Sequence, residues 1–321
     1  MKAIQYTTYG LPDVLALKEI AKPVPGDDKV LIKIHAASVN AWDWDLLRGK
    51  PFLTRIGGFF KPRYSILGAD IAGRIEAVGK NVKQFQPGDD VMGDISGYGW
   101  GGFAEYVCVP EKALIPKPPG MTFNEAAAVP QAAVLALQGL RYRGTIQKGQ
   151  KVLINGAGGG VGTFAVQIAK SCGAEVTGVD STRKLEMLRA LGADHVIDYT
   201  QEDFTQNGLR YDLILDVTAT HSIFDYKRAL NPKGIYVMIG GVSRRVLQLI
   251  FLGPLISVTG SRKMGLLLYK PDNNDLNDIN ALWEAGKVVP VIDSCYPLEE
   301  VAEALRYFGE GNARGKVVIT I

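Results

Sequence analysis

The segment from Lys151 to Cys172 constrains the fold of this chain more than any other. It begins with 151–155, a short apolar and β-branched run that predicts a buried strand. A glycine-rich turn follows, and 163–169 then carries apolar residues at helical spacing. Strand, glycine turn and helix form a phosphate-binding corner, because glycine lets backbone N–H groups approach a pyrophosphate closely. The segment therefore predicts a dinucleotide site.

The turn runs from Gly156 to Gly162, with alanine where the first glycine of the usual G-x-G-x-x-G pattern stands. We expect six of its residues to contact the cofactor: Ala157, Gly158, Gly159, Gly160, Val161 and Gly162.

The residues after the second predicted strand bear on which nicotinamide cofactor is used. Asp180 ends that strand, and an acid there accepts hydrogen bonds from both ribose hydroxyls, which favours NAD(H). However, Ser181, Arg183 and Lys184 follow at once, and a hydroxyl with two cations suits a 2′-phosphate. An alternative is that the two cations form a solvated helix face. We expect NADP(H), with NAD(H) as the alternative that Asp180 supports.

Length and composition limit the remaining possibilities. A chain of 321 residues is long for one core, so we expect two domains. Its net charge of +3 is too small to indicate nucleic acid or membrane as a partner, so we expect neither. Three scattered cysteines fit a reducing compartment, and no signal-peptide pattern opens the sequence, so the expected location is the cytoplasm. The most apolar window, 246–258, is too short and too broken to span a bilayer.

The pattern of elements changes near Met121. Before it, short β-like runs and turn residues predict an irregular antiparallel β-domain. After it, a capping box at Thr122–Glu125 opens a helix, and strands alternate with helices. This alternation predicts a doubly wound parallel sheet. Its strands are expected at 151–155, 175–180, 195–198, 211–216, 234–240 and 256–260, and its clearest helices at 161–172, 182–191 and 222–230.

The tail after residue 260 predicts helices at 274–285 and 298–308 and strands at 288–291 and 316–321. We assign it to the first domain, which makes the nucleotide-binding domain an insertion. The expected α/β architecture is therefore a β-domain of residues 1–121 and 261–321 and an inserted domain of residues 122–260.

Several stretches resemble a known family: Ala37–Asp43, Leu67–Gly73, Gly102–Tyr106, the glycine turn, Leu191–Tyr199 and Arg314–Val317. Together they are similar to the medium-chain dehydrogenases/reductases, in the zinc-free quinone oxidoreductase (zeta-crystallin-like) branch. The resemblance implies a GroES-like catalytic domain formed by both chain ends, an inserted Rossmann domain, and an active site in the cleft between them. In this family the expected partner is a second copy, paired through edge strands of the nucleotide domain, for which Leu255–Thr259 is apolar enough. The alternative is that a helix covers this apolar edge.

The ligands of a zinc site are missing. Zinc members of the family present cysteine near Val39–Asn40 and Gly-His-Glu near Gly68, where this chain has asparagine and Gly68-Ala69-Asp70. Three cysteines and three histidines scattered along the sequence do not supply converging ligands. We therefore expect no metal, and a substrate that carries its own electron sink, as quinones and α,β-unsaturated carbonyls do. The alternatives are a zinc-free alcohol dehydrogenase-like enzyme acting on aldehydes and a non-catalytic nucleotide-responsive protein.

Three residues are catalytic candidates. Asn40 resembles the family asparagine near the nicotinamide and the reacting carbonyl, although an asparagine here could also form an Asx turn. Asp43 orients that loop or relays a proton, or is a helix N-terminal acid. Tyr64 is either a phenol donor or a packing residue.

Further cofactor contacts are expected where strands end and where the tail resembles the family. Tyr199 resembles the tyrosine beside the adenosine phosphate, and Arg314 and Lys316 resemble a contact near the nicotinamide. The residues that follow predicted strands are Val217, Ile239, Gly240, Gly241, Val242, Ser261 and Arg262.

Overall fold

The computed structural model describes residues 1–321 apart from the side chain of Leu53. The chain forms two compact units: Met1–Ala132, Pro271–Asn280 and Pro290–Ile321 make the first, and Ala133–Lys270 and Ala281–Val289 make the second. The bounds differ from those expected at residues 121 and 260. The first unit keeps α2 (Phe123–Ala128), and the second includes the strand β13 (Lys263–Leu266).

The first unit is built on a seven-stranded sheet. Its strand order is β14 (Ile292–Pro297), β15 (Lys316–Thr320), β3 (Lys29–Ser38), β4 (Asp70–Val78), β5 (Asp90–Asp94) and β7 (Ile115–Pro116), with β6 (Tyr106–Pro110) paired to β3. β15 pairs antiparallel with β3 and parallel with β14, so the last strand of the chain completes a sheet begun near its start. A separate hairpin joins β1 (Lys2–Gln5) and β2 (Ala16–Glu19).

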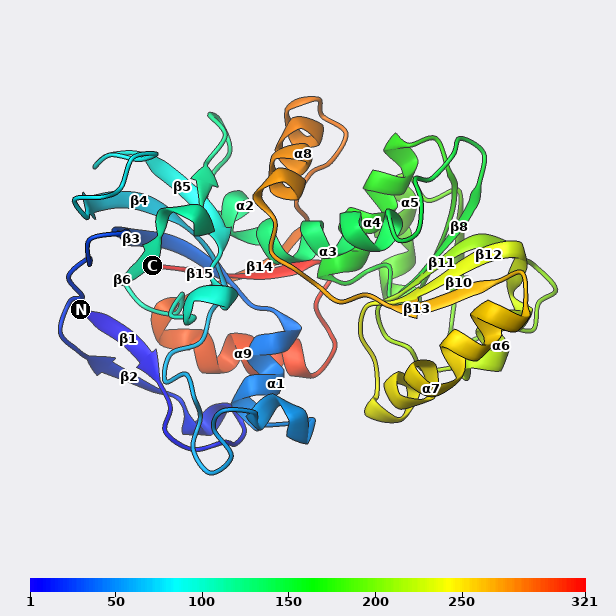
Figure 1. The fold of residues 1–321 in the computed structure, drawn as a ribbon, viewed down its shortest axis with the longest axis horizontal. Coiled ribbons are helices and arrows are strands. Elements are labelled where there is room, and N and C mark those ends of the chain that lie inside the picture. Colours follow the sequence, from blue (N-terminus) through cyan, green and yellow to red (C-terminus); the bar gives the residue numbers. More distant parts are fainter. The chain divides into compact units, whose positions relative to one another are not determined.

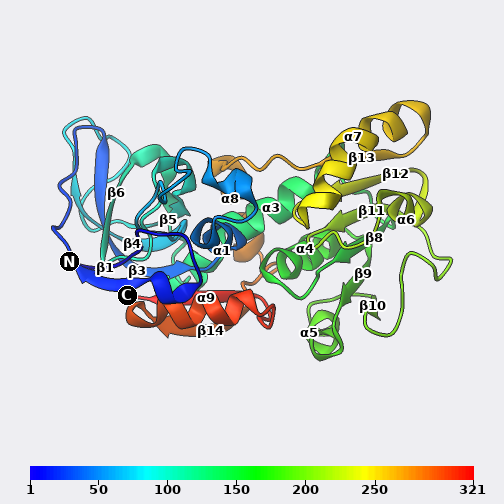
Figure 2. The ribbon, with the colours of Figure 1, turned by 90° about the horizontal axis from the view of Figure 1, so that it is seen from below.

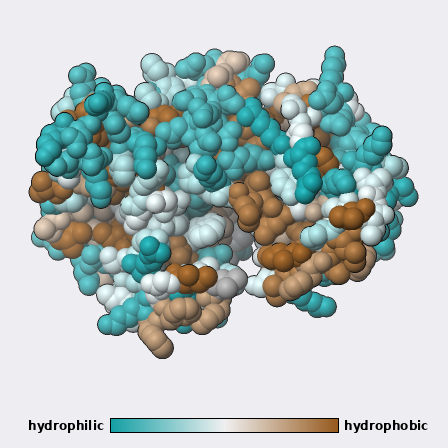
Figure 3. Space-filling model, viewed as in Figure 1, coloured by the Kyte–Doolittle hydropathy of each residue, from teal (hydrophilic) through white to brown (hydrophobic). Residues whose placement is uncertain are grey.

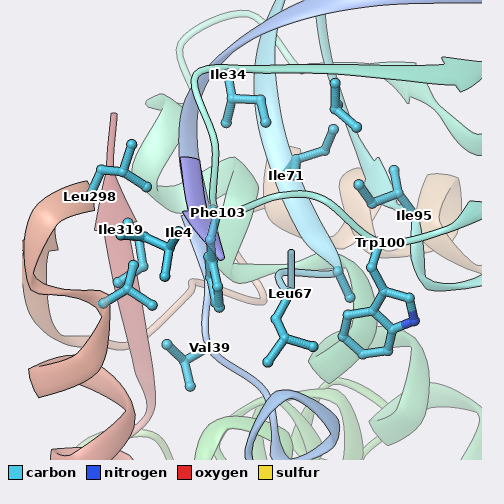
Figure 4. Packing of buried hydrophobic residues seen from close by; sticks show 14 of the residues in the cluster. Ile4, Ile34, Val39, Leu67, Ile71, Ile95, Trp100, Phe103, Leu298 and Ile319 are labelled. Carbon is cyan, nitrogen blue, oxygen red and sulfur yellow. The ribbon is translucent and has the colours of Figure 1, made fainter. Parts of the chain in front are cut away.

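The core of this unit is apolar and draws on distant parts of the sequence. Figure 4 shows Ile34 and Ile71 from β3 and β4 packed with Phe103, while Ile4 lies beside Leu298 and Ile319. All of these side chains are buried. Because burial of apolar area is the main favourable contribution to folding, this cluster fixes how the two chain ends associate.

Helices border this sheet. α1 (Ala41–Arg48) ends at Gly49, whose φ of 58° is the left-handed conformation that glycine adopts freely at a helix C-terminus. α2 begins at Thr122, whose side chain accepts a hydrogen bond from the Glu125 N–H at 3.2 Å, which confirms the predicted capping box. α9 (Val301–Gly309) follows β14, and α8 (Asn273–Glu284) crosses a bound between the units.

The second unit is a doubly wound α/β domain, as predicted. Its six parallel strands lie in the order β10 (His195–Asp198), β9 (Glu175–Asp180), β8 (Lys151–Asn155), β11 (Tyr211–Asp216), β12 (Leu230–Met238) and β13. Figures 1 and 2 place α4 (Gly160–Ser171) and α5 (Leu185–Ala190) on one face, and α6 (Ile223–Arg228) and α7 (Ser243–Thr259) on the other. α3 (Pro130–Leu140) leads into the unit.

Two predicted strands are wrong. Residues 256–259 form the end of α7, Gly260 follows the helix, and the sixth strand is β13 instead. The segment is apolar and β-branched, and a short run of this kind does not distinguish a strand from a partly buried helix. Leu255–Thr259 is therefore helical and is not a sheet edge. The strand expected at 288–291 begins only at Ile292.

α7 is apolar on both of its faces. Leu249 and Ile256 are buried against the sheet, whereas five large side chains on the other face are exposed. We call these the α7 stripe: Leu247, Ile250, Phe251, Leu255 and Val258. Figure 3 shows apolar side chains gathered where Figure 1 places α7, at the lower right.

Among the described residues, no helix has the length and hydropathy needed to cross a bilayer.

Candidate functional site

The glycine turn joins β8 to α4 with the predicted geometry. Gly156 has a φ of 82°, which suits glycine, and the Gly158 N–H donates a 2.8 Å hydrogen bond to Asp180 Oδ2. A Cβ on Gly162 would lie 2.2 Å from the Gly156 carbonyl oxygen. Gly156 and Gly162 are therefore required by the turn itself and by the packing of α4 against it.

Gly159 is glycine for a different reason. It precedes α4 with φ −91° and ψ −179°, an extended conformation that any residue can adopt. A Cβ there would meet one atom, the Gly156 carbonyl oxygen at 3.6 Å. Neither the backbone nor the described neighbours exclude a side chain, so the space is open at the N-terminus of a 12-residue helix. An open helix N-terminus after a glycine turn is where dinucleotide-binding folds hold a pyrophosphate.

Asp180 is held by the glycine turn and is almost fully buried. Besides Gly158, its carboxylate accepts a 2.8 Å hydrogen bond from the Ser181 N–H, and Lys184 Nζ lies 3.7 Å away. Lys184 is buried too, whereas Arg183 is exposed. The two cations expected beside the ribose, Arg183 and Lys184, therefore differ in their surroundings. Lys184 faces Asp180 and packs on Gly158, whereas the Arg183 side chain is exposed to solvent. Tyr199 is exposed, and its N–H donates to the Asp180 carbonyl oxygen.

Other predicted contacts lie at the same edge of the sheet. Val217 follows β11 and donates to the Asn155 carbonyl oxygen, and Ile239 follows β12 and donates to that of Asp216. Gly240, Gly241 and Val242 come next along the chain. The carboxyl ends of β8, β11 and β12 therefore meet beside the glycine turn, where open parallel sheets bind ligands.

The prediction for Ser261 and Arg262 is wrong in its premise. Both residues precede β13, so they lie at the amino ends of the parallel strands, away from the glycine turn. Arg262 Nε donates a 3.0 Å hydrogen bond to the Leu230 carbonyl oxygen, at the start of β12. We do not retain them as cofactor contacts, because the misplaced strand at 256–260 was the reason for choosing them.

The first unit contains a buried polar group that we call the Asp70 cluster: Asn40, Asp70 and Lys316. Lys316 Nζ donates to Asn40 Oδ1 at 2.5 Å and to the Val39 carbonyl oxygen at 3.2 Å, and lies 3.6 Å from Asp70 Oδ2. Asn40 Nδ2 donates to the same Asp70 oxygen at 3.0 Å. The structure therefore brings together two residues, Asn40 and Lys316, that the sequence analysis chose for separate reasons.

Asp70 is the member of this cluster that the sequence analysis missed. It is fully buried at the start of β4 and also accepts hydrogen bonds from Ser38 Oγ and the Gln131 N–H. Burial raises the pKa of its carboxyl to about 7, although Lys316 acts in the opposite direction. Burial also lowers the pKa of Lys316, against the attraction of Asp70. An acid directly inside the apolar run 66–72 was the available signal.

Asp43 orients the loop that carries Asn40. It is the third residue of α1, and its carboxylate accepts 2.8 Å hydrogen bonds from the N–H groups of Asn40 and Gly68. Burial raises the pKa of this carboxyl to about 7. Tyr64 is half-buried with its ring 6.0 Å from that of Trp100, so it packs on the core. Arg314 is exposed just before β15.

Metal ligands do not converge in the described part of the chain. Within it, no group of three or more His, Cys, Asp or Glu side chains could hold a metal ion. His35 stacks on Phe123 with ring centroids 4.4 Å apart, which is a packing role. Asn40 and Asp70, at the positions where zinc members have ligands, belong instead to the Asp70 cluster. Val39 accepts a hydrogen bond from Lys316, and Gly68 donates one to Asp43.

Comparison with known proteins agrees with this arrangement. Residues 26–119 match the alcohol dehydrogenase GroES-like domain, and residues 191–319 match the family described as zinc-binding dehydrogenase. The chain is 36% identical over 332 residues to 2-methylene-furan-3-one reductase of Solanum lycopersicum, covering 99% of this chain and 79% of the relative. It is 33% identical over 337 residues to the chloroplast envelope quinone oxidoreductase homolog of Arabidopsis thaliana, covering 99% and 98%.

Another relative is the NADPH-dependent alkenal/one oxidoreductase of Arabidopsis thaliana, 34% identical and covering 99% of this chain and 79% of the relative. Among solved structures, the quinone oxidoreductase from Coxiella burnetii has a TM-score of 0.89 at 30% identity, covering 100% of this chain and 99% of that one. The match named for zinc binding reflects shared fold, because this chain lacks the zinc ligands at the corresponding positions. The chain belongs to the medium-chain dehydrogenase/reductase family, in its zinc-free quinone oxidoreductase-like branch.

Proposed function

We propose that this protein is an NADPH-dependent reductase of quinones or α,β-unsaturated carbonyls. The observation that carries the proposal is the open space beside Gly159, at the N-terminus of α4 within the glycine turn, where dinucleotide-binding turns hold a pyrophosphate. A bound nicotinamide cofactor would supply a hydride. The relatives named above include a quinone oxidoreductase homolog and an NADPH-dependent alkenal/one oxidoreductase.

The Asp70 cluster supports the chemical part of the proposal. One hydrogen of the Asn40 amide nitrogen points to Asp70, and an amide nitrogen carries two. We propose that the second donates to the carbonyl oxygen of the substrate, where negative charge develops on reduction. Lys316 holds the amide oxygen, so the direction of this donor is fixed before the substrate arrives. A conjugated substrate can use such a modest donor, because it spreads the charge itself.

The cofactor preference follows from how Asp180 is held. Its carboxylate already accepts hydrogen bonds from the turn and lies near Lys184, which reduces its repulsion of a 2′-phosphate. Ser181 and the exposed Arg183 follow Asp180 directly in the sequence, and they are the groups that we propose for contact with that phosphate. We therefore propose NADP(H) as the cofactor, with Arg183 as the main determinant of the preference over NAD(H).

Gly159→Val tests the nucleotide site. We expect the variant to fold with unchanged thermal stability and to lose at least about a hundredfold in NADPH affinity, because the branched side chain fills the open space. Gly26→Val is the matched control, since a Cβ on Gly26 meets nothing within 4 Å. Titration of each variant with NADPH gives the affinity, and equal affinity in wild type and Gly159→Val would refute the site.

Steady-state oxidation of NADPH tests the reaction. The rate should rise on adding a small quinone or an enone, and no such rise with simple aldehydes is expected. Tight NADPH binding without turnover of any of these would favour the alternative of a nucleotide-responsive binding protein.

Arg183→Ala tests the cofactor preference. It should shift the ratio of kcat/KM for NADPH to that for NADH towards NADH by about tenfold or more. Arg189→Ala, another exposed arginine on the same helical segment, should leave the ratio unchanged.

We propose that a second copy of the chain covers the α7 stripe. Residues 246–261 contain no charged side chain, and charged residues are depleted at the centres of protein interfaces. The neighbouring strand β13 is an edge of the sheet, so backbone groups are also available there. Sedimentation should show a dimer that Phe251→Glu converts to monomer, while Val24→Glu, at another exposed apolar residue, does not.

We also propose a reducing compartment such as the cytoplasm, where the three free cysteines stay reduced.

A further inference from the structure

The segment between Asp45 and Asp70 differs in charge from the rest of the chain. It contains no acidic residue and carries five cations, Arg48, Lys50, Arg55, Lys61 and Arg63, although the net charge of the whole chain is +3. This local concentration of positive charge is not visible in the total. It lies on the loop of residues 50–63 and on the end of α1.

The same loop exposes large apolar side chains to water. Phe60 is 97% exposed, Phe52 64%, Ile56 63% and Phe59 53%. The rings of Phe52 and Phe59 lie 5.8 Å apart, so at least two of these side chains gather on one part of the surface. Contiguous apolar side chains at the surface indicate an interaction site.

The loop nevertheless has a defined conformation. Tyr9 Oη donates a 2.5 Å hydrogen bond to the Gly58 carbonyl oxygen, and the Gly58 N–H donates to that of Arg55 at 2.8 Å. The Arg55 guanidinium lies 4.5 Å from the centre of the Tyr9 ring. Contacts within the loop and with Tyr9 therefore hold cations and apolar side chains together in one short segment.

The residues of the α7 stripe carry no charge, and the two cations of the same helix, Arg244 and Arg245, precede the stripe. The cations that follow it, Arg262 and Lys263, donate hydrogen bonds to the carbonyl oxygens of Leu230 and Ser257. The α7 stripe thus suits another apolar protein surface. The 50–63 loop suits a surface that is negatively charged outside and apolar beneath.

We propose that the 50–63 loop docks on an anionic lipid membrane. Phe60 and its apolar neighbours would enter the boundary between headgroups and acyl chains, while Lys50 and Lys61 contact lipid phosphates. A nucleic acid offers the same negative charge, but its hydrated phosphate chain gives Ile56 and Phe60 no apolar surroundings. The proposed ligands of the enzyme, quinones and enones, are not needed for this inference.

Flotation with lipid vesicles tests the proposal on the full chain without cofactor. The protein should float with vesicles of phosphatidylcholine containing phosphatidylglycerol, should not float with phosphatidylcholine alone, and should dissociate as salt is raised. Phe60→Ser should reduce binding about tenfold. Lys50→Ser combined with Lys61→Ser should reduce it about 25-fold, since each surface cation contributes about fivefold.

Two control variants are matched to these changes. Val24→Ser alters a side chain that is 86% exposed, and Lys287→Ser removes an exposed cation elsewhere. Both should float like the wild type. Absence of binding to the anionic vesicles, equal binding to neutral ones, or equal loss in the controls would overturn the proposal. Lipid-free self-association that Phe60→Ser abolishes would also overturn it and would assign the loop to a second copy.

Discussion

Asp70 in the first unit and Asp216 in the second are both fully buried, and they are stabilised differently. Asp216 accepts hydrogen bonds from Tyr236 Oη at 2.8 Å, Asn155 Nδ2 at 2.9 Å and the Ala219 N–H at 2.8 Å. All of these donors are neutral. Asp70 instead lies 3.6 Å from the ammonium of Lys316. The Asn40 amide connects the two, because its nitrogen donates to Asp70 and its oxygen accepts from Lys316.

The difference indicates what each carboxylate does. Asp216 ties the ends of β8 and β12 to the loop after β11, which shapes the sheet edge beside the glycine turn. A cage of neutral donors is enough for that, because no cation has to be held in place there. Asp70 holds a cation and an amide in fixed directions inside an apolar unit. Buried ion pairs of this kind are weak sources of stability, so their value lies in positioning.

Removing the cation should have the largest effect. Lys316→Met leaves Asp70 buried without its counter-charge, which should lower the free energy of unfolding by about 3–5 kcal/mol at pH 8. Urea unfolding measures the loss. The double variant with Asp70→Asn should recover much of it, because the uncompensated charge is then gone. A double variant as unstable as Lys316→Met would mean that packing, not charge, explains the loss.

The loss should also depend on pH. The pKa of Asp70 is about 7 in the folded protein, against an ordinary value of 3.8, so the folded state binds this proton more tightly than the unfolded chain. Its contribution to stability is therefore present at low pH and is lost as pH rises through about 7. Lys316 lowers this pKa, so in Lys316→Met the carboxyl stays protonated to a higher pH. The substitution should therefore lower the free energy of unfolding less at pH 5 than at pH 8. An equal loss at both would contradict this account.

Asp216→Asn should have a smaller effect. Burial raises the pKa of the Asp216 carboxyl, so its contribution to stability is lost as pH rises, and the loss on substitution should be larger at low pH than at high pH. The substitution keeps one oxygen for the Ala219 N–H and Asn155, and the Tyr236 hydroxyl can accept a hydrogen bond from the new amide. We expect a loss of about 1–2 kcal/mol in urea unfolding. A loss as large as that of Lys316→Met would remove the distinction between the two carboxylates.

The sequence predicted the second unit well because its signals are local. The bounds of β8, β9, β10 and β11 match the predicted ranges, and the glycine turn has the expected form. Hydrophobic periodicity and turn glycines are set within a few residues, so they can be read without the fold. The failure came at 256–260, where α7 is apolar on both faces and periodicity carries no information.

The candidate site could be predicted only in part. Asn40 and Lys316 are 276 residues apart, and their contact depends on β15 pairing with β3. No local pattern reports that pairing, so Asp70, which joins them, was missed. Likewise, Asp180 and Lys184 looked like competing signals in the sequence, whereas the structure places them 3.7 Å apart as partners.

A final prediction concerns turnover, where the two carboxylates should separate most clearly. Asp70→Asn keeps the size of the side chain but removes the charge that faces Lys316. Its amide has only one acceptor oxygen, so it cannot serve Asn40 and Ser38, which share Oδ2, and also the Gln131 N–H on Oδ1. The Asn40 amide then loses its fixed direction. We expect kcat for quinone reduction to fall about tenfold, corresponding to about 1.4 kcal/mol, with little change in KM for NADPH.

Asp216→Asn should show the opposite pattern of kinetic effects, a changed KM for NADPH and a nearly unchanged kcat, because the loop that Asp216 holds lies beside the glycine turn. Any effect should fall on KM for NADPH, with kcat within about twofold of wild type. Steady-state kinetics of both variants at saturating quinone gives the two parameters directly. Asp70→Glu, which restores the charge at a slightly different distance, should recover part of kcat if Asp70 acts through Lys316 and Asn40. A merely structural role for Asp70 predicts instead that kcat follows the fraction of folded protein in all three variants.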